Sequence, residues 1–470
     1  MKSDALGQIS RGAETIVAPM TPAGVSAVAA LRVSGTRVRD VVRRLFGEKV
    51  EKSLKPRRAS LGPARGPASG RVLDSLLYIY FESPNSYTGE DVLELYPHGN
   101  PLIVRDLLQA IRSVEGVRLA DPGEYTRRAF LNGKMDLAQA ESVADVIHSA
   151  NRAELANAHR LLSGALSKKV AALTAQVKDI SARLELDVDF AEEEADPDYD
   201  GWQEKFEKIR ESVRSILAGF RGQANLRKIP LAVLYGAPNA GKSSLVNALL
   251  GEDRVLVSNI PGTTRDFVEV RLFLDGGEIR LIDTAGIADR AADELDALSQ
   301  KKSREILEEA DLKILVVEAL DERKGSLVDE GSPDVVVYSK CDLLDERGET
   351  RDGRIQTSTP NSELRTPDFL RVSSKTGAGL AGLKRAMNEA LFKEGENPED
   401  LWITSEREKA CLEEALAGID RVLKQLAENP AVELLAFEMQ LVRRALQSIT
   451  GEISSEDVLQ SIFAGFCIGK

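Results

Sequence analysis

The sequence contains few of the residues that build disulfide frameworks or metal centres. Its 470 residues include three cysteines and three histidines. Cys341, Cys411 and Cys467 are odd in number, lie far apart and form no CxxC pair, so neither a disulfide framework nor a zinc site is predicted. The small number of histidines also argues against a His-rich metal site. This cysteine usage is typical of a reducing compartment and favours the cytoplasm.

Long apolar runs are also missing. No stretch approaches the ~18 apolar residues of a membrane span, and the polar start MKSDALGQISRGAE lacks the apolar core of a secretory signal, so we expect no membrane association. The formal net charge of −13 argues against non-specific coating of nucleic acid, although a local basic patch suffices to bind RNA. Arg127-Arg128 and Arg443-Arg444 are candidate patches, for which solvated helix faces are the favoured interpretation.

The length predicts more than one domain, because single cores stop growing at about 250–300 residues. Residues 1–133 mix strand-like runs such as TIVAPMT, SLLYIYFES and DVLELY with short helical patterns, which predicts an α+β domain. No proline occurs between Pro122 and Pro197, and apolar residues there fall at three- and four-residue steps, with Gly164 as an interruption. Long helices are therefore predicted in a segment that spans 134–226.

From Ile229 the pattern alternates strand, loop and helix, which predicts a doubly wound, mostly parallel sheet over 227–392. Helical stretches are predicted at 293–310 and 377–392. Residues 345–368 contain two large aliphatic side chains and are predicted to form a loop. Helical patterns return in 393–470, so the simplest architecture is an α/β domain inserted into a helical one, with the α+β domain leading.

The stretch Gly236-x4-Gly241-Lys242-Ser243 follows a predicted strand and opens a predicted helix, the context of a phosphate-binding loop. Lys242 is expected to reach the β- and γ-phosphates as a catalytic residue, and the Ser243 hydroxyl to bind Mg²⁺. A glycine-rich turn with chance spacing is the alternative. Backbone N–H groups and the helix N-terminus would cradle the phosphates; the predicted contacts are Asn239, Ala240, Gly241, Lys242, Ser243 and Ser244.

Further motifs follow in the order that a GTPase requires. Asp283 can hold the magnesium hydration shell, the Gly286 N–H can meet the γ-phosphate, and Thr264 suits a switch residue that completes Mg²⁺ coordination. Asp342 of SKCD can accept two hydrogen bonds from the guanine edge, which adenine does not offer, so GTP is predicted over ATP. The remaining nucleotide contacts predicted from these motifs are Ser258, Asn259, Ile260, Pro261, Gly262, Thr263, Thr284, Ala285, Ser339, Lys340, Ser373, Ser374 and Lys375.

Two positions depart from the usual GTPase pattern. Ser339 stands where Asn or Thr is usual and is shorter than Asn, so base specificity is expected to depend on Asp342 and the stem of Lys340. Ile287 stands where Ras-like enzymes place a water-orienting glutamine. An aliphatic side chain cannot orient water, so the catalytic group must come from elsewhere.

GAPNAGKSSLVNAL, PGTTRDF, DTAG and the terminal FCIGK together resemble the MnmE (TrmE) family, bacterial GTPases that modify tRNA uridine, and the likeness covers essentially the whole chain. In the first domain, SYTGEDVLELYPHGN and DPGEYTRRAFLNGKMDLAQAE also look like family signatures. The resemblance implies a multidomain fold: an N-terminal α+β folate-binding and dimerisation domain, a discontinuous all-α helical domain and an inserted α/β P-loop GTPase (G) domain of Ras-like type.

The resemblance also implies an activity. Family members form homodimers, bind 5-formyltetrahydrofolate and join an FAD-dependent MnmG (GidA)-type protein in a hetero-tetramer. Together they install an aminomethyl or carboxymethylaminomethyl group at C5 of the tRNA wobble uridine. Folate contacts carried over by motif are Arg32, Glu94, Lys134 and Lys470, a set that offers cations to a glutamate tail and a carboxylate to an aminopyrimidinone ring. Ordinary surface charge is the alternative for the first three.

Three further roles follow from the resemblance. K⁺ stimulates GTP hydrolysis in the family, and Asn239 with carbonyl groups of Ser258, Ile260 and Thr263 is expected to bind this ion; Asn239 could instead bond its own backbone. Asp296 aligns with a water-positioning glutamate, with Glu294 and Asp293 as competitors and solvated helix-start acids as the alternative. Cys467 could act as nucleophile or proton donor near the folate, or be packed.

Two other functions stay open from the sequence. A ribosome-assembly GTPase would share the nucleotide motifs, but such proteins typically carry a KH-like module, and no GXXG loop in that setting is seen beyond the G domain. A folate-binding regulatory module, whose GTPase only times assembly, is the other alternative.

Overall fold

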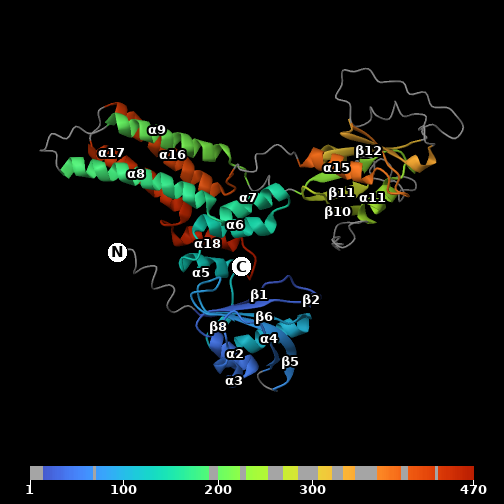
Figure 1. Cartoon of the computed structure of the whole chain (residues 1–470), viewed down its shortest axis with the longest axis horizontal. Helices are drawn as coiled ribbons and strands as arrows, with labels where there is room; N and C mark the ends of the chain where they lie inside the picture. The colour runs from blue at the N-terminus through green and yellow to red at the C-terminus, as the bar shows by residue number, and fades with distance from the viewer. Residues whose placement is uncertain are drawn as a thin grey trace. The chain divides into compact units, whose positions relative to one another are not determined.

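The computed structural model describes residues 14–66, 70–189, 199–222, 229–251, 268–283, 305–319, 332–344, 368–392, 401–428 and 432–469. The chain forms two compact units (Figure 1). The first comprises Met1–Ile147, Ala158–Phe220 and Leu401–Lys470, and the second comprises His148–Asn157 and Arg221–Asp400. The predicted boundaries at 133, 226 and 392 stay predictions.

The first unit begins with a six-stranded mixed sheet of order β4-β5-β6-β3-β1-β8. Strands β1 and β8 are parallel, and the other neighbours are antiparallel. A short pair, β2 (Ser26–Val28) and β7 (His98–Gly99), stands apart from this sheet. The six strands are β1 (Thr15–Pro19), β3 (Leu31–Ser34), β4 (Ser60–Arg65), β5 (Val72–Phe81), β6 (Val92–Tyr96) and β8 (Val117–Leu119).

Both faces of this sheet are covered, because successive side chains of a strand point to opposite faces. Val17 packs with apolar residues of helices α2 (Val38–Phe46) and α4 (Pro101–Arg112) on one face. Ile16 and Ala18 pack with Tyr125 on the other face. The predicted α+β arrangement is thus confirmed. The helices of this part are α2 (Val38–Phe46), α3 (Glu48–Lys52), α4 (Pro101–Arg112) and α5 (Glu124–Leu131).

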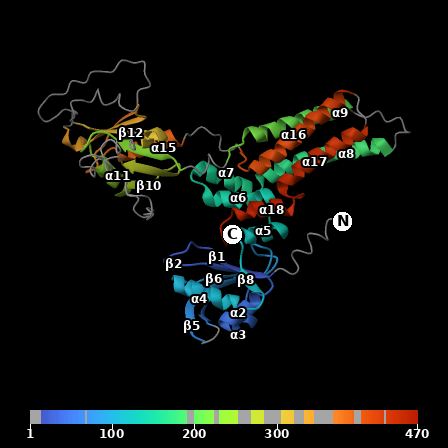
Figure 2. The same ribbon diagram turned by 180° about the vertical axis from the view of Figure 1, so that it is seen from behind.

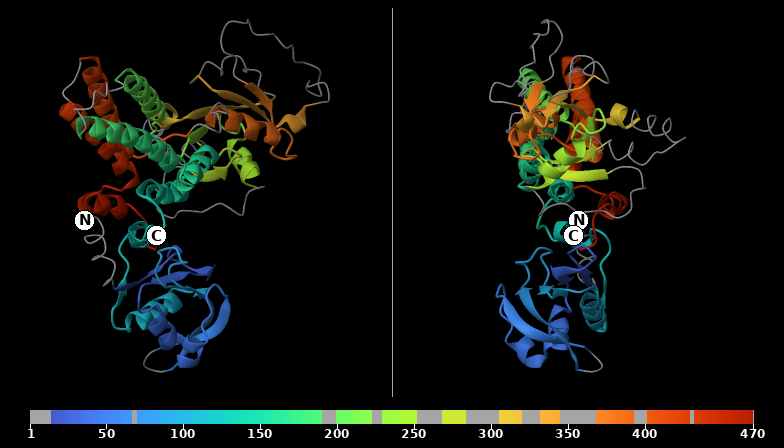
Figure 3. Two further views of the ribbon diagram at one scale, coloured as in Figure 1. Left: turned by 60° about the vertical axis from the view of Figure 1, so that its left-hand side comes forward. Right: turned by 90° about the vertical axis from the view of Figure 1, so that its right-hand side faces the viewer.

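The rest of the first unit is helical. Its core is a bundle of four long helices, green for α8 and α9 and red for α16 and α17 (Figure 1, Figure 2 and Figure 3), around buried side chains such as Trp202, Phe206 and Met439. The last helix packs on α6 through Phe463 and Phe466. The helices are α6 (Leu137–His148), α8 (Ala165–Asp189), α9 (Tyr199–Ala218), α16 (Glu406–Ala427), α17 (Val432–Thr450) and α18 (Glu456–Ala464). Helix α7 (Arg152–Leu162) has its first residues in the second unit and its last in the first.

The predicted interruption of these helices at Gly164 is confirmed, since the residue separates α7 from α8 at φ +85°. A second break, after α6, was not predicted. There the chain pairs with the second unit's own hairpin: the Arg152 N–H donates to the Gly276 carbonyl at 2.8 Å, and the Glu278 N–H donates to the Ala150 carbonyl at 3.0 Å. These hydrogen bonds explain why residues 148–157 belong to the second unit.

One charge assignment from the sequence is wrong. Arg128, expected on a solvated helix face, is buried on α5 and forms ion pairs with Glu90 and Glu124. Its neighbour Arg127 pairs with Glu456 of α18. Arg128 therefore helps to hold the first unit together, because a buried guanidinium requires a carboxylate partner, whereas the Arg127 pair is partly exposed.

The second unit contains a six-stranded sheet of order β10-β11-β9-β12-β13-β14. All neighbours are parallel except β10 and β11, so the predicted mostly parallel sheet is confirmed. Residues 305–309 are helical, whereas 293–304 and 345–367 lie outside the described residues. The elements are β9 (Leu231–Tyr235), α11 (Lys242–Gly251), β10 (Val268–Phe273), β11 (Glu278–Asp283), β12 (Leu312–Glu318), β13 (Val335–Ser339), η1 (Cys341–Leu343), β14 (Asp368–Arg371) and α15 (Leu380–Leu391).

Among the described residues, no helix combines the length and the apolar composition that crossing a bilayer requires.

Candidate functional site

The phosphate-binding loop runs between the buried strand β9 and helix α11, as the sequence predicts. Gly236 adopts φ +136°, and a Cβ atom there would lie 2.2 Å from the Val316 carbonyl oxygen. Gly241 adopts φ +90° and Asn239 adopts φ +63°. L-residues with a Cβ rarely adopt such angles, although Asn tolerates the left-handed region. The loop thus requires its glycines, which argues against chance spacing.

Lys242, predicted to be catalytic, and Ser243, predicted to bind Mg²⁺, lie side by side at this loop. The Lys242 Nζ donates to the Gly236 and Ala237 carbonyl oxygens, each at 2.8 Å, so the cation is held inside the loop. The Ser243 hydroxyl donates to Asp283 Oδ2 at 2.6 Å. Asp283 ends strand β11 and is buried. A hydroxyl and a carboxylate are oxygen donors of the kind that Mg²⁺ prefers, so this pair fits a magnesium site.

A cavity of about 710 Å³ adjoins the loop at the carboxyl ends of β13 and β14. Asn247, Ala248 and Leu343 line it and were not predicted from the motifs. Residues 244, 247 and 248 lie at i, i+3 and i+4 of helix α11, so helical spacing from Ser244 was the available signal. The lining residues are Gly241, Ser244, Asn247, Ala248, Ser339, Lys340, Asp342, Leu343, Ser374 and Lys375.

Asp342 presents a carboxylate at this cavity. Its Oδ1 atom accepts a hydrogen bond from the Ser373 hydroxyl at 2.7 Å, and this bond lowers the pKa of Asp342 below its ordinary value. The group is therefore ionised at neutral pH, with lone pairs left for the N–H groups of a base. Lys340, at φ +58°, extends its ammonium to Glu318 at 2.9 Å. The predicted guanine site is thus assembled from two separate loops.

Ser339 has a different role from the base contact that the motif suggests. Its side chain is buried, and its hydroxyl donates to the Ala240 carbonyl at 2.5 Å and lies 3.3 Å from the Val317 carbonyl. The hydroxyl therefore joins the guanine motif to the phosphate loop through main-chain atoms.

Two predicted folate residues face each other in the N-terminal sheet. Arg32 of β3 and Glu94 of β6 are register partners, and Arg32 Nη2 donates to Glu94 Oε1 at 2.8 Å. Both side chains are largely buried, so neither is an ordinary surface charge. Tyr96 donates its hydroxyl to Glu94 Oε2 at 2.6 Å. Arg32 Nη1 is buried without a hydrogen-bond partner among the described residues, which leaves a donor for a ligand.

Lys134 lines a cavity of about 520 Å³ next to this pair. Its Nζ donates to the Pro84 carbonyl at 2.9 Å. Tyr87 connects the cavity to the buried pair, since its ring lies 4.9 Å from the Arg32 guanidinium carbon and also lines the cavity. The structure therefore brings three of the four predicted folate residues to one region. The cavity is lined by Arg57, Ile79, Phe81, Asn85, Ser86, Tyr87 and Lys134.

The C-terminal tail reaches the same domain. Gly469 adopts φ +97°, and a Cβ atom there would lie 2.3 Å from the carbonyl oxygen of Pro19, the last residue of β1. Phe466 is buried against α18, whereas Cys467 is exposed. The alternative that Cys467 is simply packed is therefore wrong.

The other predicted site residues lie outside the described residues, and so do Ile287, Asp293 and Glu294. They are Ser258, Asn259, Ile260, Pro261, Gly262, Thr263, Thr264, Thr284, Ala285, Gly286, Asp296 and Lys470.

The phosphate loop, the Ser243–Asp283 pair and the Asp342 carboxylate on a parallel sheet define a P-loop GTPase. Two family models match the chain: "GTP-binding protein TrmE N-terminus" over residues 15–134 and "MnmE helical domain" over 137–467. The "tRNA modification GTPase MnmE" of Erwinia tasmaniensis is 37% identical over 471 residues, covering 97% of this chain and 99% of that protein. The chain belongs to the MnmE family of tRNA modification GTPases.

A second relative agrees with this membership. The protein of the same name from Haemophilus influenzae is 37% identical over 476 residues, covering 97% of this chain and all of that protein. The G domain of the T. maritima FeoB iron transporter matches 35% of this chain and 99% of that chain at 26% identity, with a TM-score of 0.24.

Proposed function

We propose that this protein is a K⁺-stimulated GTP hydrolase that modifies C5 of the wobble uridine of certain tRNAs with a tetrahydrofolate one-carbon unit. An FAD-containing, MnmG-type partner shares the reaction. The observation that supports this most strongly is the unpartnered Arg32 Nη1 beside Glu94, because a buried cationic donor without an acceptor indicates a ligand site in the N-terminal domain. The GTP site stands in the second unit, so one chain carries both sites.

In GTP hydrolysis, the residues of the phosphate loop bind and orient the nucleotide. Lys242 would exchange its two carbonyl contacts for phosphate oxygens. Ser243 and Thr264 would hold Mg²⁺, with Asp283 hydrogen-bonded to Ser243, and Asn239 would hold K⁺. When bound there, the two cations would supply positive charge where negative charge develops between the β- and γ-phosphates. Asp296 positions the attacking water, since Ile287 cannot.

In the N-terminal domain, each ionic group suits one part of 5-formyltetrahydrofolate. The Glu94 carboxylate accepts hydrogen bonds from the aminopyrimidinone ring, and Arg32 Nη1 donates to its acceptors. Lys134 and Lys470 offer cations to the glutamate tail. Cys467 is exposed near the end of the tail and acts there as nucleophile or proton donor.

The active assembly we propose is a cytoplasmic homodimer, joined through the N-terminal domains, that forms a hetero-tetramer with the FAD-dependent protein. GTP hydrolysis then organises the one-carbon transfer through movement of the paired G domains.

Nucleoside analysis of tRNA from a deletion strain tests the proposal. We expect wobble uridine without the aminomethyl or carboxymethylaminomethyl group, restored by the wild-type gene. Arg32→Ala should fail to restore it while purified Arg32→Ala protein hydrolyses GTP normally. Ser113→Ala, a change outside the folate region, is the control and should restore it. A tRNA profile that is unchanged in the deletion strain rules the function out.

A further inference from the structure

Basic residues are concentrated in one part of an otherwise acidic chain. Residues 37–71 contain eleven Lys and Arg against three Asp and Glu, whereas the whole chain has a formal net charge of −13. A local excess of this size in an acidic protein is the pattern expected of a phosphate-binding surface.

Four of these eleven cations form ion pairs within the domain. Arg37 and Arg43 of α2 pair with Asp40, Arg39 pairs with Glu51, and Lys52 of α3 pairs with Glu48. The cations of the following loop have no such carboxylate partners in the described part of the chain.

The loop of residues 55–58, Lys-Pro-Arg-Arg, keeps its charge free. The Lys55 and Arg58 side chains are exposed and form no hydrogen bond or ion pair with any residue in the described part of the chain. Arg57 donates only to a neutral acceptor, the Asn85 carbonyl, at 3.2 Å. Three cations without a carboxylate partner among the described residues therefore lie within four positions of the chain.

The loop is held in a definite shape. The Arg57 N–H donates to the Tyr80 carbonyl at 2.7 Å, and Pro56 forms a bridge with the same strand residue. Arg57 adopts φ +59°, an unusual angle for a non-glycine residue. As a result, the Arg57 side chain lines the 520 Å³ folate cavity, whereas Arg58 lines a different cavity.

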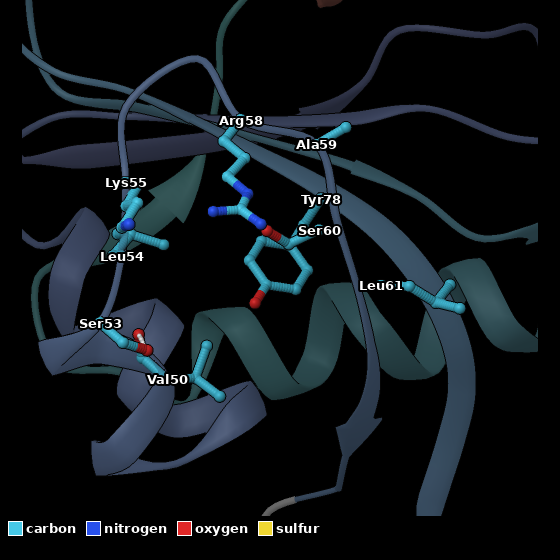
Figure 4. A pocket seen from close by; sticks show the side chains of 9 residues that line it. All are labelled: Val50, Ser53, Leu54, Lys55, Arg58, Ala59, Ser60, Leu61 and Tyr78. Carbon is cyan, nitrogen blue, oxygen red and sulfur yellow. Dashed lines mark hydrogen bonds between the residues drawn. The ribbon is translucent and has the colours of Figure 1, made fainter.

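This second cavity has a volume of about 500 Å³. Figure 4 shows the Arg58 side chain pointing into it toward Tyr78. The Tyr78 ring stacks on Phe46 with ring centroids 4.4 Å apart, and Leu61 at the rim is 73% exposed. Apolar and aromatic surface beside free cations suits a nucleobase next to its phosphate. The cavity is lined by Val50, Ser53, Leu54, Lys55, Arg58, Ala59, Ser60, Leu61 and Tyr78.

We infer that the 55–58 loop and the Tyr78 cavity form an RNA-binding surface that holds a single-stranded loop beside the folate cavity. Lys55 and Arg58 bind phosphate oxygens, and an unstacked base enters the cavity. Adjacent residues Arg57 and Arg58 belong to the two cavities, so RNA bound at one lies next to the other. This inference rests on the proposed function, which requires a tRNA loop to meet the folate.

A charge-reversal variant of the full-length protein tests the surface. Lys55→Glu/Arg58→Glu should weaken binding of a fluorescent anticodon stem–loop RNA by about tenfold at low salt. It should also flatten the slope of log K against log salt by about 1.4, because each single-strand phosphate contact contributes about 0.7. Lys55→Arg/Arg58→Lys keeps the charges and should bind as the wild type does. A fully paired RNA of equal length should bind more weakly than the stem–loop.

Lys168→Glu/Lys169→Glu on α8 is the matched control, since it makes the same change in net charge at two exposed lysines elsewhere. It should leave RNA binding within twofold. The inference is overturned if the reversal variant binds RNA as tightly as the wild type, or if the control variant loses as much RNA affinity as the reversal variant. It is also overturned if sedimentation shows that the reversal variant has changed from dimer to monomer. Loss of 5-formyltetrahydrofolate binding in the reversal variant would also overturn it. Failure of the proposed function would appear separately, as unchanged tRNA nucleosides in the deletion strain.

Discussion

At the scale of single residues, the proposed guanine site depends on the protonation and direction of one side chain. Asp342 accepts a hydrogen bond from Ser373, and the resulting low pKa keeps it ionised. Ser339, in the same motif, has its hydroxyl bonded to main-chain oxygen atoms. We therefore expect the Asp342 carboxylate to discriminate between bases.

Asp342→Asn should shift preference from GTP toward xanthosine triphosphate, because the amide donates where the carboxylate accepts. Hydrogen bonds to a charged group contribute about 1.5–3 kcal/mol each, so kcat/KM for GTP should fall on the order of 10²-fold. Steady-state hydrolysis of both nucleotides measures this. Ser373→Ala, which keeps the acceptor, should retain GTP preference. An unchanged preference for GTP in Asp342→Asn would contradict the proposed role of Asp342 in base recognition.

Asn239 is the described member of the proposed K⁺ site. Replacing Na⁺ with K⁺ should raise the GTPase rate of the wild type severalfold, and Asn239→Ala should remove the difference, since its amide oxygen is a ligand. Asn239→Gly tests the same point without strain, because the residue has φ +63°. Asn247→Ala, which changes an amide in the base cavity, is the control and should keep the K⁺ effect. Equal wild-type rates in the two salts would refute the ion assignment.

At the scale of elements, strand β8 and helix α5 are joined by an ionic network. Arg118 of β8 donates to both oxygens of Glu124, the first residue of α5, at 2.7 Å each. Burial by itself raises the pKa of Glu124, but the hydrogen bonds from Arg118, the Asp121 N–H and Arg128 bring it to about 2. The carboxylate therefore stabilises the fold most when it is ionised.

This network predicts acid sensitivity. The pKa of Glu124 is about 2 in the folded state against an ordinary 4.5, so its stabilisation is present above pH 4.5 and is lost as pH falls toward 2. Arg118→Ala should reduce the free energy of unfolding at pH 7 by about 1–2 kcal/mol and bring acid unfolding to higher pH. Thermal denaturation as a function of pH measures both. Arg105→Ala, at an exposed pair, should change little; identical profiles for the two variants would contradict the expectation.

The phosphate loop predicts a steric effect. Gly236→Ala should abolish high-affinity GTP binding, because its Cβ would lie 2.2 Å from the Val316 carbonyl and its φ is +136°. Such backbone strain costs about 1–3 kcal/mol, and the phosphate-binding loop would have to move to relieve it. Titration with a fluorescent GDP analogue measures the loss. Gly251→Ala is the matched control, since a Cβ there meets nothing within 4 Å. Wild-type affinity in Gly236→Ala would show that the loop adapts.

At the scale of the whole molecule, the first unit joins residues from both ends of the chain. The C-terminal tail follows α18 to the end of strand β1, where Gly469 meets Pro19. The tail thus brings Cys467 to the domain that carries Arg32 and Glu94. The proposed folate site depends on this return of the chain.

Gly469→Ala tests this connection. The added Cβ would lie 2.3 Å from the Pro19 carbonyl at φ +97°, so the tail should be displaced. We expect 5-formyltetrahydrofolate binding to weaken by about tenfold, the effect of roughly 1.4 kcal/mol, with the basal GTPase rate unchanged. Isothermal titration and GTPase assays measure the two. Gly465→Ala, whose Cβ would have ordinary contacts, should bind folate normally. Equal folate affinity in both variants would show that the C-terminal tail does not contribute to folate binding.

Much of the fold could be predicted, because strands, helices and the phosphate loop depend on neighbours in sequence. Apolar spacing indicated the bundle helices, and glycines 236 and 241 indicated the loop. The break after α6 escaped prediction, since it results from hydrogen bonds between Ala150–Arg152 and the distant Gly276–Glu278. The proposed folate residues came from the family resemblance, because spacing alone could not bring together Arg32 and Glu94, which are 62 positions apart.

By itself, the sequence determined the elements and the GTP-binding motifs, whose chemistry resides in a few consecutive residues. Only the tertiary structure decided which charges are buried and which stay free. Arg128 is enclosed by carboxylates, Ser339 is bonded to the phosphate loop, and Arg58 faces an open cavity. The physical reason is that burial and ion pairing depend on segments far away in the chain, so residues of the same type acquire different roles.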